Sequence, residues 1–206
     1  MSKIEQLFVT QVYRAELSSR TGRALNEELG AGALYLARED QAGRRWCKEN
    51  GYPGYTSYAS LTDLPARIPA FADLTIAIDA HSRAFARALD FELPGRKLVM
   101  DSLWVNVLDP GGQHSAHIHP QSVLSGTYYV AVPAGASALK LEDPRLGLMM
   151  AAPARRPKAR THNRSFVYLE PKVGTLLMWE SWLRHEVPVN KARGKRISVS
   201  FNYRLD

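Results

Sequence analysis

The sequence predicts a mainly β fold of the α+β class, in which an antiparallel sandwich or jelly roll follows N-terminal helices that pack on the sheet. Two observations support this prediction. Apolar residues recur at helical spacing within residues 1–96, whereas short apolar runs with extended periodicity follow one another from Lys97 onward. No helical segment separates these later runs, which excludes a parallel α/β sheet, and no glycine-rich nucleotide-binding motif is present.

The composition is that of a globular domain. Of the 206 residues, 45% are hydrophobic and 23% are charged. We expect residues 1–206 to fold as one domain, in which a helical region, 1–96, supports a jelly-roll core, 97–206. No run approaches the roughly 18 apolar residues of a membrane helix, so we expect a soluble, cytoplasmic protein. Cys47 is the only cysteine, which excludes an internal disulfide and favours a small packed residue over a reactive thiol.

The first elements follow from local patterns. Residues 5–13 are rich in β-prone side chains and predict a short opening strand. Ser18 or Ser19 then caps a helix that runs to about residue 39, and apolar residues recur along it at helical spacing. Residues 50–67 are rich in Gly, Pro, Ser, Thr and Tyr and are typical of a surface connection. The apolar stripe of the helix consists of Leu25, Leu29 and Leu36.

A second helix has a clearer apolar stripe, and Pro94 with Gly95 marks its end. His81 lies on this stripe, so we expect a packed or hydrogen-bonded core histidine and not a metal ligand. The stripe residues are Phe71, Leu74, Ile78, Phe85 and Leu89.

Seven β-prone runs follow, and together with the opening strand they predict about eight strands. Trp104, Trp179 and Trp182 lie in or beside these runs, where we expect them to pack in the core or at its rim. The runs are KLVMDSLWVNVLD, TYYVAV, ALKLED, FVYLE, GTLLMW, HEVPV and KRISVSFNYRL.

Three of the six histidines lie within HSAHIHP, residues 114–120. His117 and His119 are two positions apart, so an extended chain directs both to one face. Two imidazoles on one face can hold one divalent metal such as iron or zinc. The best candidate for a third ligand is His185, which lies beside another predicted strand. The sequence therefore predicts a mononuclear metal site.

The net charge of +7 is concentrated locally, because residues 145–164 carry six basic and no acidic side chains. Such a segment attracts anionic partners. It lacks interleaved aromatic residues for base stacking, and two prolines interrupt it, so a solvated basic loop is favoured and nucleic acid is not an expected partner.

Arg196 follows His185 by eleven residues, in RISVSF. With these residues in view, roughly Leu103 to Tyr203 resembles the double-stranded β-helix core of the Fe(II)/2-oxoglutarate-dependent oxygenases, most closely the prolyl-hydroxylase-like branch and its bacterial and phage relatives. In that superfamily a His-x-Asp/Glu pair and a distal histidine hold the iron. An arginine about ten residues later binds the far carboxylate of 2-oxoglutarate. SGTYYV, LLMWES and the Arg196-x-Ser198 pair also agree with the pattern.

The resemblance implies ferrous iron and 2-oxoglutarate as cofactors, with His117, His119 and His185 as the metal ligands. Arg196 would bind the far carboxylate through a planar, permanently charged guanidinium. The other expected cosubstrate contacts are Ser198, which shares a face with Arg196, and Tyr129 and Asn106. Periodicity cannot choose between Tyr128 and Tyr129; the resemblance favours Tyr129.

The implied reaction is hydroxylation of an unidentified substrate, coupled to decarboxylation of 2-oxoglutarate to succinate. The expected substrate is a small molecule or a peptidyl side chain, with an anionic group favoured if residues 145–164 form the rim of the barrel mouth. A homodimer through the N-terminal helices is compatible with the sequence, and a membrane partner is not expected.

One residue departs from the family pattern, because His119 stands where the family has Asp or Glu. Three neutral imidazoles leave the ferrous centre with its full double charge, which strengthens binding of a dianionic cosubstrate. The departure keeps other ligand sets open: His114 could ligate in place of His119 or lie just outside the coordination shell, and Asp143 or Glu142 could approach the metal.

Two other functions also fit the pattern. One is a cupin-like three-histidine dioxygenase that acts without 2-oxoglutarate, in which Arg196 binds the carboxylate of the substrate. The other is a non-catalytic metal- or anion-binding β-barrel, in which the basic segment contacts a partner. Dependence of oxygen consumption on 2-oxoglutarate separates the three functions.

Overall fold

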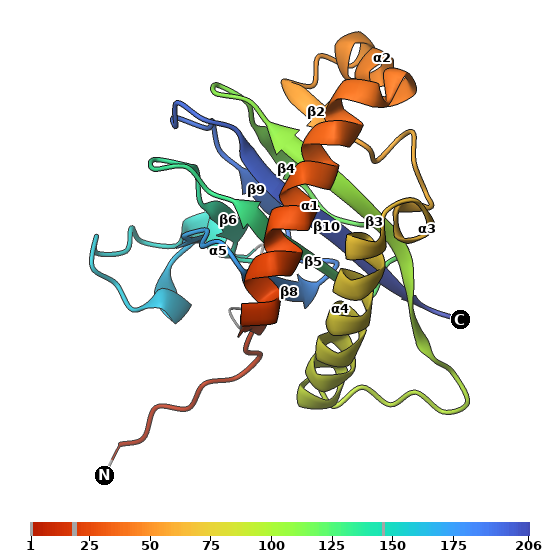
Figure 1. Cartoon of the computed structure of the whole chain (residues 1–206). Helices are drawn as coiled ribbons and strands as arrows, with labels where there is room; N and C mark the ends of the chain where they lie inside the picture. Colours follow the sequence, from red (N-terminus) through yellow and green to blue (C-terminus); the bar gives the residue numbers. More distant parts are fainter. Residues whose placement is uncertain (1, 18–19, 146) are drawn as a thin grey trace.

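The computed structural model describes residues 2–17, 20–145 and 147–206, in which two antiparallel sheets are covered on one side by helices (Figure 1). The larger sheet has the order β1-β8-β5-β10-β3-β2 and the smaller sheet the order β4-β9-β6-β7. The strands of the larger sheet are β1 (Val12–Glu16), β2 (Gly54–Thr56), β3 (Leu98–Leu108), β5 (Leu124–Ala131), β8 (Thr175–Glu180) and β10 (Arg196–Leu205). Those of the smaller sheet are β4 (His114–His117), β6 (Leu139–Glu142), β7 (Phe166–Leu169) and β9 (His185–Val187).

Two long helices, α1 (Arg20–Glu39) and α4 (Pro69–Ala88), lie across the outer face of the larger sheet (Figure 1). Leu29, Leu36, Phe71, Leu74 and Ile78 are buried against that face, as the two apolar stripes predict. The remaining helical segments are α2 (Gln41–Glu49), α3 (Leu64–Arg67), α5 (Leu148–Ala151) and the 3-10 turn η1 (Thr161–Asn163).

A second apolar cluster fills the space between the two sheets. It joins Leu108, Tyr129 and Trp179 of the larger sheet to Leu141 and Val187 of the smaller one. The fold therefore has three layers, helices, large sheet and small sheet, with one core on each side of the large sheet.

All seven strand runs predicted after Lys97 form strands, and the jelly-roll prediction is confirmed. The count of eight was too low, since the short strands β2 and β4 bring the described part of the chain to ten. Both have only three or four residues, so each carries little periodicity, and pairing with β3 or β9 stabilises them as strands.

The N-terminal region differs from the prediction in three places. The opening strand covers Val12–Glu16, whereas residues 5–11 form none, and Phe8 is 95% exposed because no sheet edge lies beside it. Residues 50–67 hold β2 and α3 and bury Tyr55, Thr56 and Leu64, so they are not only a surface connection. Helix α2 was missed. Ser18 and Ser19, the predicted caps of α1, lie outside the described residues.

Helix α4 ends at Ala88, several residues before Pro94, because Asp90 takes a left-handed conformation with φ of 54°. His81 packs as predicted, since its Nδ1 lies 2.8 Å from the hydroxyl of Tyr13 and the two rings are in contact. Cys47 is buried, and its sulfur hydrogen-bonds the backbone of Thr56.

The basic segment leaves the smaller sheet between β6 and β7 and projects from the body of the molecule (Figure 1). Most of its described residues are exposed, and Arg145 forms an ion pair with Asp143 at 2.6 Å. Across the described ranges, no helix is long and apolar enough to cross a membrane.

Candidate metal and cosubstrate site

His117, His119 and His185 converge on one point between the two sheets. His117 ends β4 and is the cross-strand partner of His185 on β9. His119 lies two residues further on, where its backbone N–H donates to the carbonyl of Ser181 at 3.0 Å. One nitrogen from each ring lies within 4.8 Å of the other two, which is the arrangement that a single metal ion requires.

Backbone carbonyls orient two of these rings. The Nδ1 of His185 donates to the carbonyl of Leu183 at 2.8 Å, and that of His117 donates to the carbonyl of Ser115 at 2.6 Å. The proton is thereby held on Nδ1, and the lone pair of Nε2 is directed away from the backbone and is available for a metal. His119 Nε2 lies 3.2 Å from His185 Nε2, and their rings are parallel.

Burial favours the neutral form of His185 and His119. Burial, followed by the charge of the neighbouring His117, lowers the pKa of His185 to about 3. Burial, with His117 again as the second cause, lowers the pKa of His119 to about 4. Neutral rings with free lone pairs are the form in which histidine binds a metal.

His114 does not belong to this group. Its Nε2 hydrogen-bonds the hydroxyl of Tyr52, and burial followed by the charge of Arg196 lowers its pKa to about 3. The two carboxylates considered as alternative ligands are engaged elsewhere, because Glu142 pairs with Arg184 at 3.0 Å and Asp143 pairs with Arg145.

Arg196, Ser198 and Tyr129 lie side by side on neighbouring strands of the larger sheet. Tyr129 on β5 is the cross-strand partner of Ser198, and the guanidinium of Arg196 lies 5.0 Å from the centre of the Tyr129 ring. Tyr128 faces the other way, where its hydroxyl donates to Asn26 on α1 at 3.1 Å. Tyr129, chosen from the resemblance, is thus the tyrosine on the side of Arg196.

Two polar atoms in this group are buried without a hydrogen-bond partner among the described residues, Nε of Arg196 and Oη of Tyr129. Arg196 is 2% exposed, and no described carboxylate pairs with it. A buried cation without a partner is costly. Two adjacent buried groups with unmet hydrogen-bonding capacity fit the carboxylate end of a ligand.

Asn106 connects this group to the N-terminal region. Its amide oxygen accepts a hydrogen bond from Thr56 at 2.9 Å and a longer one from Tyr52 at 3.4 Å, and its amide nitrogen donates to Ser200 at 3.1 Å. No sequence pattern pointed to Tyr52 or Thr56, because a contact across about fifty residues leaves no local pattern.

The imidazoles and Arg196 line one cavity of about 310 Å³, which Asn106 and Ser198 also line. Its outer wall is apolar and includes Trp46, Tyr58 and Trp104. No described residue of the basic segment lines it, so the expectation that this segment forms the rim is not met.

The three predicted packing tryptophans differ in position. Trp104 is 8% exposed and contacts Tyr58 and His119, and Trp179 packs edge-on against His185 with ring centres 4.7 Å apart. Trp182 is 46% exposed at the surface. Trp104 and Trp179 therefore pack against neighbouring rings and also line the metal cavity.

Known proteins match both the sequence and the fold. The family model described as "Putative 2OG-Fe(II) oxygenase" matches residues 102–202, a range that contains every residue predicted to bind metal or cosubstrate. No curated protein sequence matches the chain. Among solved structures, a Pseudomonas putida prolyl-4-hydroxylase has 16% identity and a TM-score of 0.56, over 95% of this chain and 92% of that one.

Two further structures have similar folds. The viral collagen prolyl hydroxylase of Paramecium Bursaria Chlorella virus-1 is 12% identical, with a TM-score of 0.59 over 93% of this chain and 94% of that one. HygX from Streptomyces hygroscopicus, solved with iron bound, is 12% identical, with a TM-score of 0.60 over 94% of this chain and 82% of that one. At such identities the likeness shows the fold, the double-stranded β-helix. The family model adds that residues 102–202 match the Fe(II)/2-oxoglutarate-dependent oxygenases, enzymes whose cofactors are ferrous iron and 2-oxoglutarate.

Proposed function

We propose that this protein hydroxylates an unidentified small-molecule or peptidyl substrate and converts 2-oxoglutarate to succinate and CO2. One observation carries the proposal: three grouped imidazoles and an unpaired buried arginine line the same cavity of about 310 Å³. The imidazoles fit a metal ion, and the arginine fits a carboxylate. Iron and 2-oxoglutarate supply these two groups.

His117, His119 and His185 would hold the iron. Bound iron with 2-oxoglutarate supplies the oxidative decarboxylation and the oxygen transfer. His119 replaces the carboxylate of the family pattern, so the protein contributes no negative charge at the metal. We infer that this favours 2-oxoglutarate, because the cosubstrate brings two negative charges to a site that carries none of its own.

Arg196 would bind the far carboxylate of 2-oxoglutarate, with Tyr129 donating its hydroxyl to the same group. Burial raises the pKa of Tyr129, which keeps that hydroxyl protonated and able to donate. Ser198 adds a hydroxyl two positions along β10, and Asn106 holds the adjoining wall through its bonds to Thr56 and Ser200. These residues orient the cosubstrate and compensate its charge.

The substrate would enter beside the aromatic wall formed by Trp46, Tyr58 and Trp104. These side chains present apolar surface that excludes water from the reacting carbon. Apart from Arg196 no charged side chain lines this cavity in the described residues, so the reacting part of the substrate is expected to be uncharged.

We further propose that the chain works as one domain. Strands β1 and β2, from the first 96 residues, pair with β8 and β3 of the large sheet, and Tyr52 and Thr56 complete the wall of the cavity. Removing the N-terminal region would therefore open the proposed site.

The test is release of succinate from 2-oxoglutarate in the presence of ferrous iron and oxygen. We expect turnover in the wild type, loss of iron binding in His185→Ala, and loss of 2-oxoglutarate binding with retained iron binding in Arg196→Ala. Lys191→Ala, which removes an exposed charge, is the matched control and should behave as the wild type.

Purified protein that binds neither iron nor 2-oxoglutarate would contradict the proposal. Oxygen consumption that does not depend on 2-oxoglutarate would favour the cupin-like alternative. Metal binding with no oxygen consumption across a substrate panel would favour the non-catalytic alternative.

A further inference from the structure

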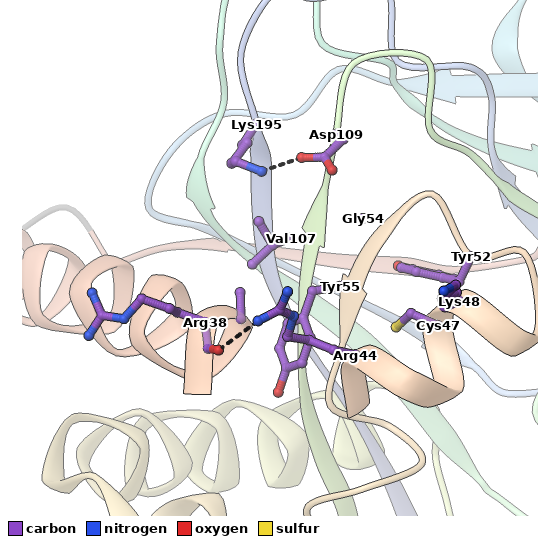
Figure 2. A pocket seen from close by; sticks show the side chains of 11 residues that line it. Arg38, Arg44, Cys47, Lys48, Tyr52, Gly54, Tyr55, Val107, Asp109 and Lys195 are labelled. Atoms are coloured by element: carbon purple, nitrogen blue, oxygen red, sulfur yellow. Dashed lines mark hydrogen bonds and ion pairs between the residues drawn. The ribbon is translucent and has the colours of Figure 1, made fainter. Parts of the chain in front are cut away.

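A second cavity, of about 510 Å³, lies outside the metal site (Figure 2). It is bounded by the C-terminal end of α1, one face of α2, strands β2 and β3, and the loop before β10. Tyr52 is the one residue that lines both cavities among the described residues. Four cationic residues line the second cavity, Arg38, Arg44, Lys48 and Lys195, against a single acid, Asp109.

Two of these cations are compensated. The side chain of Arg38 forms an ion pair with Glu39, and Figure 2 shows its guanidinium directed away from the rest of the lining. Lys195 forms an ion pair with Asp109, and this pair spans the loops that follow β3 and precede β10. Neither pair leaves a net charge in the cavity.

Arg44 and Lys48 have no compensating carboxylate within the described ranges. Arg44 donates from Nη1 to the backbone carbonyl of Arg38 at 3.1 Å, which fixes its position but does not neutralise its charge (Figure 2). Lys48 forms no ion pair and no side-chain hydrogen bond in the same ranges. The cavity thus holds two uncompensated positive charges.

The placement of these two residues opposes helix stability. They are four residues apart on α2, so they share a face, and like charges at this spacing destabilise a helix. Arg45 carries the same charge but does not line the cavity. A hollow lined by two unpaired cations is a site suited to an anion.

We propose that this cavity binds a phosphate group, either free or carried as a monoester. The dianion matches the two uncompensated charges. Its terminal oxygens can accept hydrogen bonds from the planar guanidinium of Arg44 and from the ammonium of Lys48 together. A monocarboxylate carries half the charge and has fewer acceptor oxygens. This inference does not depend on the proposed reaction at the metal.

The test is isothermal titration calorimetry with inorganic phosphate, acetate and a phosphoserine peptide, at constant ionic strength. The variants are Arg44→Gln, Lys48→Gln and the double substitution. Arg45→Gln is the matched control, because it removes the same charge from the same helix outside the cavity. Arg196→Met serves as a second control, since it removes the buried cation of the other cavity.

We expect saturable phosphate binding that is at least about tenfold weaker in the double variant, with both controls within about twofold of the wild type. Acetate should bind at least about tenfold more weakly than phosphate. Preference for the peptide over inorganic phosphate would support the site and identify a protein-borne monoester as its source.

The proposal is overturned if neither phosphate probe binds saturably or if acetate binds as well as phosphate. It is also overturned if Arg45→Gln or Arg196→Met weakens binding as much as the double variant does. Thermal unfolding of each variant, compared with the wild type, confirms that a lost signal does not come from a lost fold.

Discussion

The two faces of strand β10 are both largely buried and are chemically opposite. One face carries Ile197, Val199, Phe201 and Tyr203, which pack beneath helices α1 and α4. The other carries Arg196, Ser198, Ser200 and Asn202, which line the metal cavity. Arg196 at 2% exposed is as inaccessible as Ile197 at 4%. Burial alone therefore does not distinguish residues that stabilise the fold from residues that serve the site.

The difference lies in how the buried groups are satisfied. Each fully buried apolar side chain on the helix face contributes about 1.5–3 kcal/mol by leaving water. On the cavity face, the buried guanidinium of Arg196 keeps an unmet donor and has no described counter-ion. Such a group costs stability until a ligand meets it. We infer that the side chains of the helix face stabilise the sheet, whereas the polar side chains of the cavity face lower the stability of the ligand-free protein and serve ligand binding.

The largest effect is expected from truncation of a side chain on the helix face. Phe201 is completely buried, and its ring lies so close to Gly126 on β5 that any β-carbon there would collide with it. We expect Phe201→Ala to lower the free energy of unfolding by about 3–5 kcal/mol, measured by chemical denaturation. The fraction that remains folded should bind iron and 2-oxoglutarate as the wild type does. A loss below about 1 kcal/mol would contradict the role assigned to this face.

The converse change is Arg196→Met on the cavity face, which keeps an extended side chain and removes the charge. We expect 2-oxoglutarate to bind roughly 30- to 1,000-fold more weakly, because its far carboxylate would be buried without a counter-charge. The free energy of unfolding of the ligand-free protein should stay constant or rise, since an unpaired buried charge is removed. Denaturation and calorimetry on one preparation measure both effects. A stability loss as large as that of Phe201→Ala would contradict the inference that Arg196 serves binding and not the stability of the fold.

Strand β10 also illustrates which features of the fold and the site could be predicted from the sequence. In RISVSF, alternation of apolar and polar residues predicts both the strand and the common face of Arg196 and Ser198, and both are observed. The stripe from Phe71 to Phe85 likewise predicts α4, and His81 on it packs as expected.

The walls of the site could not be predicted. Tyr52 and Thr56 belong to a stretch rich in turn-forming residues, and only pairing of β2 with β3 brings them to Asn106. Residues 5–11 have strand-forming composition but no described partner strand, so tertiary context overrides their propensity. The assignment of His119 over His114 as a ligand stays a prediction, although the geometry groups His119 with the other two rings.

The smallest expected change in stability concerns a histidine on the helix side. His81 packs against Tyr13 between α4 and β1, and burial lowers its pKa below the ordinary value of 6.5. Because the unfolded chain then binds the proton more readily than the folded chain, stability is fully present above about pH 6.5 and falls as the pH drops below it. The buried histidines of the metal cavity shift in the same direction, so the wild-type curve alone does not isolate His81.

The difference between the wild type and His81→Gln does isolate it. Glutamine can still hydrogen-bond Tyr13 but does not titrate, so its curve should lack one component of the acid-side decline. We expect that component to be roughly a few tenths of a kcal/mol, because the ring is only partly buried and solvent screens its charge. Chemical denaturation of metal-free protein at intervals between pH 5 and 8 measures it. Parallel curves for the two proteins would show that the helix side, unlike the cavity side, carries no proton-linked stability.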